Sequence, residues 1–226
     1  MNYLAHFYLA DANADSLIGQ LLGDFVKGSP DHRYGAEIRA AIRFHRRMDT
    51  FTDHHPVVRT SRRRFSPQRR RFAGVMLDLC HDHFLARHWH RFSNEHLGAF
   101  TRRVYAELKR TAGIPLPERL GQVLSHMIAN DWLGQYRHLE RVGYALDRIA
   151  GRLTRGECFM GSIAEIKTHY AMLENDFERF FPDMIAFARD YRENQCRVER
   201  TSDGNVHLHS GRQCGDPDHE QRGESI

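Results

Sequence analysis

The sequence predicts an all-α protein, and two patterns along the chain support this prediction. Apolar residues recur at three- and four-residue steps through most of the chain before residue 201, which is the spacing of amphipathic helices. No run of alternating β-branched residues indicates a sheet. With 226 residues, of which 41% are hydrophobic, the chain can bury one substantial core. We expect a single helical domain over residues 1–200 and a disordered polar tail, rich in Gly, Asp, Ser and His, over residues 201–226.

Four helices are expected in the first part of the chain. The first covers residues 2–10, and the second has Ser16 as its N-cap and ends near Phe25. Gly19 and Gly23 lie four residues apart in this second helix, a spacing that lets a neighbouring helix approach closely. A third helix is predicted over residues 35–53, because Pro56 disfavours its continuation. The fourth is predicted to begin at Pro67 and to end near Phe92.

Further helices are expected in the second part. Leu97, Phe100, Val104 and Leu108 have helical spacing, and the Gly-Ile-Pro sequence at 113–115 breaks the helix that carries them. Pro117 suits the first turn of the next helix, which is predicted to continue to residue 139 with a kink near Gly134. A short helix over residues 146–153, a longer one over 163–180 and a last one from Pro182 to Tyr191 complete the prediction.

Acids and histidines occupy positions on the helix faces that otherwise carry apolar side chains. We call each such row of residues at three- and four-residue steps a stripe. Asp78 and Asp82 follow Val75 on one stripe of the fourth predicted helix, with His83 on the neighbouring stripe. In the third predicted helix, a stripe that begins with Ile38 and Ile42 runs on into the acids and the histidine at positions 45, 49 and 53. Buried acids are rare unless a partner offsets their desolvation. These stripes therefore predict a bound cation or a polar cleft.

The donor types narrow the choice of cation. His45, Asp49 and Asp53 project from one helical face at one-turn intervals, and mixed nitrogen and oxygen ligands suit Mn²⁺, Mg²⁺, Fe²⁺ or Zn²⁺. Each residue alone also fits a structural role: Asp53 at a helix end, Asp49 in an ion pair with Arg46, and His83 in the core. Together they favour a cation, because one domain rarely buries this many like charges without one.

The cysteines and the charged residues predict the cellular compartment and the kind of partner. The four cysteines are widely spaced and form no CxxC pair, which argues against a cysteine zinc site and favours a reducing cytoplasm. Neither a signal peptide nor a membrane span is expected. The net charge is +4, and seven of the thirteen residues from Arg59 to Arg71 are arginine. This stretch predicts either an anionic partner or a solvated basic surface.

Four motifs together are similar to those of the acyl carrier protein phosphodiesterase family. They are MNYLAH at 1–6, GxxxGDF at 19–25, HRRMDxxTD at 45–53 and DxxxDHFLxRHW at 78–89, and the resemblance extends over roughly residues 1–190. It implies a divergent, HD-type helical hydrolase that uses a divalent metal, typically Mn²⁺. The implied reaction removes 4′-phosphopantetheine from holo acyl carrier protein. The Asp82-His83 dipeptide has the reverse order of the usual HD pair.

The resemblance and the residue pattern lead to one set of expected site residues. The metal ligands are His6, Asp24, His45, Asp78 and Asp82. Asp49 or His83 would donate a proton to the leaving serine oxygen, and Arg46 would bind the phosphodiester oxygens. The expected partner is an acidic carrier protein, with neither nucleic acid nor membrane.

Two other classes of protein remain open on the sequence alone. An HD-type nucleotide phosphohydrolase would use the same metal ligands. A basic, helical nucleic-acid-binding protein would explain the arginines between positions 59 and 71, but the inward-facing acids would repel phosphates unless a cation is bound.

Overall fold

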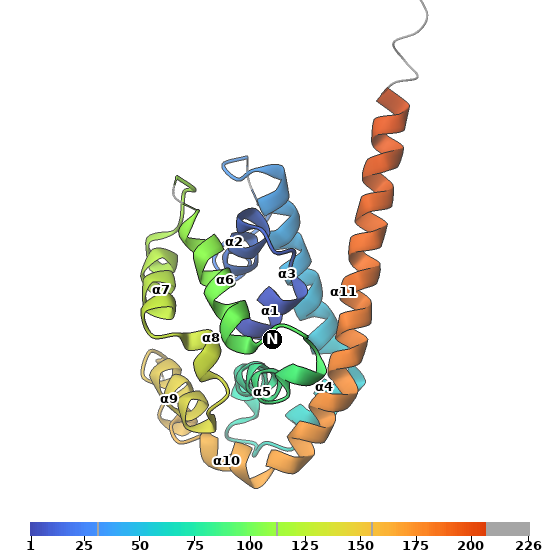
Figure 1. Ribbon diagram of the computed structural model, residues 1–226. Coiled ribbons are helices and arrows are strands. Elements are labelled where there is room, and N and C mark those ends of the chain that lie inside the picture. The colour runs from blue at the N-terminus through green and yellow to red at the C-terminus, as the bar shows by residue number, and fades with distance from the viewer. Residues whose placement is uncertain (31, 112, 155, 207–226) are drawn as a thin grey trace, which may run out of the picture. The chain divides into compact units, whose positions relative to one another are not determined.

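The computed structural model describes residues 1–30, 32–111, 113–154 and 156–206, with side chains as far as residue 195. Every regular element in these segments is a helix, as predicted (Figure 1). The α-helices of the first half are α1 (Tyr3–Leu9), α2 (Ala14–Leu22), α3 (Ala36–His54), α4 (Pro56–Arg62), α5 (Ala73–Arg87) and α6 (Leu97–Lys109). Those of the second half are α7 (Glu118–Ala129), α8 (Trp132–Gln135), α9 (Leu139–Ala150), α10 (Ile163–Thr168) and α11 (Tyr170–Val206). Short 3₁₀ turns are η1 (Arg70–Phe72), η2 (Trp89–Arg91) and η3 (Glu157–Phe159).

Two helix starts in the first half differ from the prediction. Asn13, rather than Ser16, caps α2: its side chain accepts the backbone N–H of Ser16, while Ser16 itself is buried inside the helix. Pro67 does not open α5, which begins at Ala73 after η1. The proline that does begin a helix is Pro56, at the first turn of the unpredicted α4, where its missing N–H costs nothing.

The second half divides differently from the prediction. Asp131 adopts a left-handed backbone conformation, with φ of 44°, and its side chain accepts the N–H of Gly134. This turn separates α7 from α8, so the predicted kinked helix is two helices, and α9 takes in most of the helix predicted over 146–153. Pro182 lies inside α11 rather than at the start of a helix. The helix tolerates this proline because of packing: Phe177, Phe180 and Phe181 around it are fully buried.

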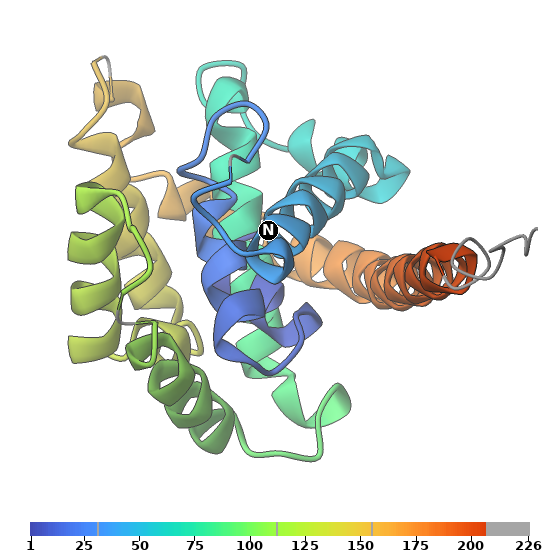
Figure 2. The same ribbon diagram turned by 90° about the horizontal axis from the view of Figure 1, so that it is seen from above.

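The chain separates into two units, and the first, Met1–Ala188, contains the core. Within it, α1 lies amid the other N-terminal helices and contacts α2 and α5 (Figures 1 and 2). The helices α7, α8 and α9 lie together at one side, on the left in both views. None of the helices in the described segments is long and apolar enough to cross a membrane.

The second unit begins at Arg189, and its described part is the end of α11. Residues 201–206 are helical, whereas the sequence analysis placed them in a disordered tail. The rest of the predicted tail, 207–226, lies outside the described residues. The predicted domain boundary at residue 200 stays a prediction.

The helices α2 and α3 pack closely along the two glycines of the predicted contact. A Cβ atom placed on Gly19 would lie 2.4 Å from the Cβ of Ala41. A Cβ on Gly23 would lie 2.2 Å from the ring of His45. The absence of side chains at these two positions thus brings α3, and His45 with it, against α2.

Candidate metal centre

Three N-terminal helices bring His6, Asp24, His45 and Asp49 together. His45 and Asp49 are one turn apart on α3, His6 lies on α1, and Asp24 follows the end of α2. One ligand atom from each of His6, His45 and Asp49 lies within 4.8 Å of the others. We call these four residues the His/Asp cluster.

Nitrogen and oxygen atoms converge within the His/Asp cluster. The two carboxylate oxygens of Asp49 lie 3.1 Å from His6 Nε2 and 3.1 Å from His45 Nε2, respectively. His45 Nε2 is also 3.3 Å from Asp24 Oδ1. The two imidazole rings stack with their centroids 4.1 Å apart. Both histidines are buried, whereas Asp24 and Asp49 are partly exposed, so the cluster is accessible from the side of its carboxylates.

The electrostatics of the His/Asp cluster favour a positive charge at its centre. Burial disfavours a charged His45, but the hydrogen bonds and charges of Asp24 and Asp49 outweigh it and raise the pKa of His45 to about 9. Burial and the neighbouring His45 lower the pKa of His6. Burial would raise the pKa of Asp49, yet its hydrogen bonds to the two histidines hold that pKa well below its usual range. The positive charge is therefore favoured on His45, whose Nε2 faces both carboxylates.

The residues of the His/Asp cluster fit a divalent cation. Neutral imidazole and ionised carboxylate are the ligating forms, and a cation that replaces the proton on His45 would satisfy both carboxylates. Mixed nitrogen and oxygen donors of this kind suit Mn²⁺, Fe²⁺ or Zn²⁺. The Nδ1 atoms of His6 and His45 are buried without a hydrogen-bond partner among the described residues. The two imidazoles are thus oriented mainly through their Nε2 atoms, which face Asp49.

Asp78, a predicted ligand, lies beside the His/Asp cluster. Its Oδ1 is 2.9 Å from the amino group of Met1, and that amino group is 3.6 Å from Asp49 Oδ1. Burial opposes a charged amino group, but Asp78 and Asp49 outweigh burial and raise its pKa to about 10. The amino group of Met1, absent from the sequence-based prediction, thus links Asp78 to the cluster.

Asp82 has a different set of contacts. Its carboxylate is fully buried and accepts the backbone N–H groups of Leu4, at 2.7 Å, and of Ala5, at 3.0 Å. Burial raises the pKa of Asp82 to about 7, although the two N–H donors oppose this shift. These N–H groups belong to the first turn of α1, where backbone donors lack intrahelical partners. Asp82 therefore anchors the helix that carries His6.

Replacing Asp82 by alanine is expected to lower the free energy of unfolding by roughly 3 kcal/mol or more, because each buried N–H left unsatisfied costs about 1–3 kcal/mol. Urea unfolding monitored by circular dichroism measures this loss. Asp53→Ala is the matched control: Asp53 is exposed and pairs with Arg62 at the surface, where such pairs contribute about 0–1 kcal/mol. Equal stability of the two variants would contradict the anchoring role.

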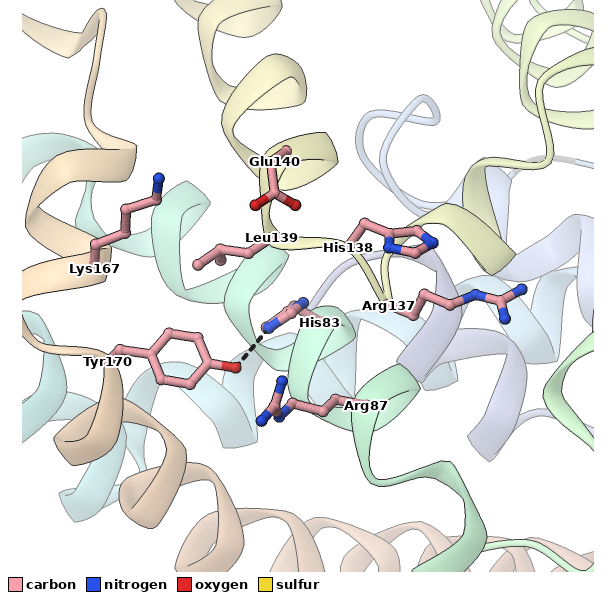
Figure 3. A pocket seen from close by; sticks show the side chains of 8 residues that line it. All are labelled: His83, Arg87, Arg137, His138, Leu139, Glu140, Lys167 and Tyr170. Atoms are coloured by element: carbon pink, nitrogen blue, oxygen red, sulfur yellow. Dashed lines mark hydrogen bonds between the residues drawn. The ribbon is translucent and has the colours of Figure 1, made fainter.

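His83, a predicted proton donor, faces a separate pocket of about 360 Å³. Its Nδ1 lies 2.8 Å from the carbonyl oxygen of Tyr136, and its Nε2 lies 2.8 Å from the hydroxyl of Tyr170. Figure 3 shows His83 and Tyr170 pointing toward each other, with Arg87 and Lys167 nearby. None of these contacts connects His83 with the His/Asp cluster, so the structure does not bring it to the other predicted site residues.

Two more residues of the HRRMDxxTD motif make contacts away from the His/Asp cluster. Arg46 donates to the carbonyl oxygens of Val26 and Gly28, each at 2.5 Å, and so braces the loop that follows Asp24. Asp53 pairs with Arg62 from α4. Neither a phosphate-binding role for Arg46 nor a metal-binding role for Asp53 is supported by these contacts.

Tyr3 is a residue of the MNYLAH motif that the sequence-based prediction did not single out. Burial raises its pKa above the usual value, the charge of Asp24 adds to this rise, and Arg119 and Arg152 oppose it. Its phenol therefore lies within electrostatic range of both the His/Asp cluster and a group of arginines. Its position three residues before His6, nearly one helical turn, was the available sequence signal.

Comparison with known proteins identifies the family to which this chain is similar. A family model described as acyl carrier protein phosphodiesterase matches residues 1–184. A Serratia proteamaculans protein named acyl carrier protein phosphodiesterase is 38% identical over 192 residues, which cover 84% of this chain and 98% of the relative. A protein of the same name from Escherichia coli O157:H7 is 37% identical over 190 residues, covering 83% of this chain and 97% of the relative. No solved structure matches the chain.

Proposed function

The chain belongs to the acyl carrier protein phosphodiesterase family, and from this membership we propose its reaction and its cofactor. The reaction is hydrolysis of the phosphodiester that links 4′-phosphopantetheine to the serine of holo acyl carrier protein. The products are apo carrier protein and 4′-phosphopantetheine. The observation that carries the proposal is the His/Asp cluster, in which two imidazoles and two carboxylates converge within hydrogen-bond distance.

A divalent cation, Mn²⁺ by resemblance to the family, is the proposed cofactor. The proposed ligands are His6, Asp24, His45 and Asp49, with Asp78 as a further carboxylate beside them. The chemistry that such a cation supplies is polarisation of a phosphoryl oxygen and a lower pKa for a coordinated water. This proposal differs from the sequence-based one in including Asp49 and leaving out Asp82, whose oxygens accept backbone N–H groups.

The protein's own residues orient this centre. Asp49 contacts both imidazoles and so fixes the orientation of His6 relative to His45. Carboxylates that orient metal-bound histidines typically affect activity 10- to 100-fold even where they are not ligands themselves. Asp24 lies at the exposed side of the cluster, where a phosphodiester from solvent would meet it.

The function is tested by mass spectrometry of holo acyl carrier protein after incubation with the enzyme and Mn²⁺. The expected result is a carrier lighter by the phosphopantetheine group, with no such loss when a chelator is present. A parallel incubation with a panel of nucleotides tests the alternative activity. Hydrolysis of nucleotides with an unchanged carrier protein would overturn the proposal in favour of a nucleotide phosphohydrolase.

A cytoplasmic location completes the proposal. The support for it is that the four cysteines are widely spaced without a CxxC pair and that Cys80 is a free, buried thiol. Thiols of this kind persist in a reducing compartment.

A further inference from the structure

A second pocket, of about 420 Å³, is lined in part by residues that are chain neighbours of the candidate site. Three of its lining residues directly follow residues of the site in the chain: Asn2 follows Met1, Phe25 follows Asp24, and Leu79 follows Asp78. The other walls come from α7, α8 and α9, the helices grouped at one side in Figures 1 and 2. We call this the α9 pocket.

The walls of the α9 pocket combine apolar and amide side chains. Phe25, Trp132 and Ile149 contribute apolar surface, and Asn2 and Gln135 contribute amides. The Asn2 amide donates to the hydroxyl of the buried Tyr136 at 2.5 Å, which links two lining residues from distant parts of the sequence. Small-molecule sites typically have this volume and this mixture of apolar walls with a few polar groups.

Four arginines line the α9 pocket: Arg119, Arg141, Arg148 and Arg152. All four are exposed, and none forms an ion pair with a described residue. Arg148 lies seven residues after Arg141 and four residues before Arg152. This spacing places the three arginines on one face of α9 and of the turn that follows it. Next to them, Tyr144 is 60% exposed and lies beneath the Arg148 guanidinium.

The arginine-rich stretch 59–71, which the sequence suggested as the docking surface, is engaged differently. Arg62 pairs with Asp53, Arg64 with Asp176 at 3.0 Å, and Arg69 with Glu165 at 2.9 Å. Arg69 also donates to the carbonyl oxygens of Cys158 and Met160. Three of the seven arginines in this stretch are thus paired with carboxylates of the protein itself. Among the described residues, the four arginines of the α9 pocket form no such ion pair.

We propose that the α9 pocket binds the 4′-phosphopantetheine arm of the carrier protein, and that its arginines contact the acidic surface of the carrier. This inference rests on the proposed function. The arm is a flexible chain with two amides and a geminal dimethyl group, so apolar walls with interspersed amides match it. Its phosphate end must reach the His/Asp cluster. The lining residues 2, 25 and 79 are chain neighbours of Met1, Asp24 and Asp78, and the lining Tyr3 lies within electrostatic range of Asp24. Charged groups around the arm then select an anionic carrier.

Ala145→Trp tests the binding of the arm. Ala145 lines the pocket from α9 and is partly exposed, so an indole there would occupy the space of the arm. The expected result is an increase of at least about tenfold in KM for holo carrier protein, equivalent to about 1.4 kcal/mol, and weaker inhibition by free 4′-phosphopantetheine. Mn²⁺ affinity and thermal unfolding should match those of Ala164→Trp, a control at an exposed alanine of α10.

Arg148→Glu tests the docking of the carrier without changing buried volume. The expected result is a KM raised about tenfold and less dependent on salt, because charges at the rim of an interface act mainly on association. The control is Arg102→Glu, at an exposed arginine of α6 that lines neither pocket. This variant also keeps the inference testable if Ala145→Trp fails to fold.

The outcomes separate this inference from the proposed function. If the wild-type enzyme with Mn²⁺ leaves holo carrier protein unchanged, the proposed function is wrong. If the wild-type enzyme removes the arm and Arg148→Glu has the same KM as Arg102→Glu, the α9 pocket is not the substrate-binding pocket. A normal KM for a folded Ala145→Trp variant leads to the same conclusion.

Discussion

Replacing Asp49 by asparagine is expected to lower kcat/KM for holo carrier protein by about 10³-fold or more. Asp49 is the residue that contacts both histidines of the His/Asp cluster, at 3.1 Å each. An asparagine has the same size but lacks the negative charge, and its amide nitrogen cannot accept from a histidine. Loss of one anionic ligand removes several kcal/mol of charge stabilisation, and about 4 kcal/mol corresponds to 10³-fold.

Isothermal titration with Mn²⁺ measures the cause directly, since the variant should bind the ion at least tenfold more weakly. Asp53→Asn is the matched control, with the same substitution one turn further along α3. Asp53 is exposed and pairs with Arg62, so its kcat/KM should stay within about twofold of the wild-type value. Wild-type turnover by Asp49→Asn would remove Asp49 from the proposed centre.

Replacing Gly23 by alanine is expected to reduce activity at least about 100-fold through displacement of His45. The new Cβ would lie 2.2 Å from Cδ2 and 2.3 Å from Cγ of the His45 ring. The backbone of Gly23 is in the ordinary right-handed helical region, so the alanine would cause no backbone strain. His45 would have to move away from Asp24 and Asp49, and a misplacement of about 1 Å in a catalytic group can cost 10²-fold.

Gly121→Ala provides the comparison for Gly23→Ala. Gly121 lies inside α7, and an added Cβ there meets nothing within 4 Å. The control variant should unfold at the same or a slightly higher temperature, because alanine favours a helix interior by about 1 kcal/mol over glycine. Measurements are Mn²⁺ affinity, kcat/KM and thermal unfolding. If Gly23→Ala keeps its affinity for Mn²⁺, the close packing of α2 against His45 is not needed for the centre.

Periodicity predicted the helices that carry the site more accurately than the places where helices begin. The predicted ranges 2–10, 35–53 and 97–108 agree with α1, α3 and α6 to within about one residue. Two of the errors occurred at prolines. Pro67 and Pro182 were both taken as helix starts, yet one lies in a turn and the other inside α11. A proline can begin a helix, end it or lie inside it. The burial of its neighbours, such as Phe180 and Phe181 beside Pro182, decides which of these occurs.

Of the acids expected at inward positions, Asp82 is buried, Asp49 and Asp78 are partly exposed, and Asp53 is exposed. Asp49 faces two histidines, whereas Asp82 faces the first turn of α1. A buried carboxylate is stabilised by a cation or by unpaired backbone N–H groups, and helical spacing is the same in both cases. The sequence therefore could not separate Asp49 from Asp82.

The sequence by itself determined the helical class, the family and the face of α3 that carries His45 and Asp49, because these depend on local spacing and on motifs. Tertiary structure alone decided which groups meet. It joined His6 to Asp49 across 43 positions and turned His83 toward Tyr170. It also paired the arginines at 62, 64 and 69 with carboxylates, whereas the arginines of the α9 pocket form no ion pair with a described residue. The physical reason is that helical periodicity sets the direction of a side chain on its own helix, whereas its charge partner comes from whichever helix packs against it.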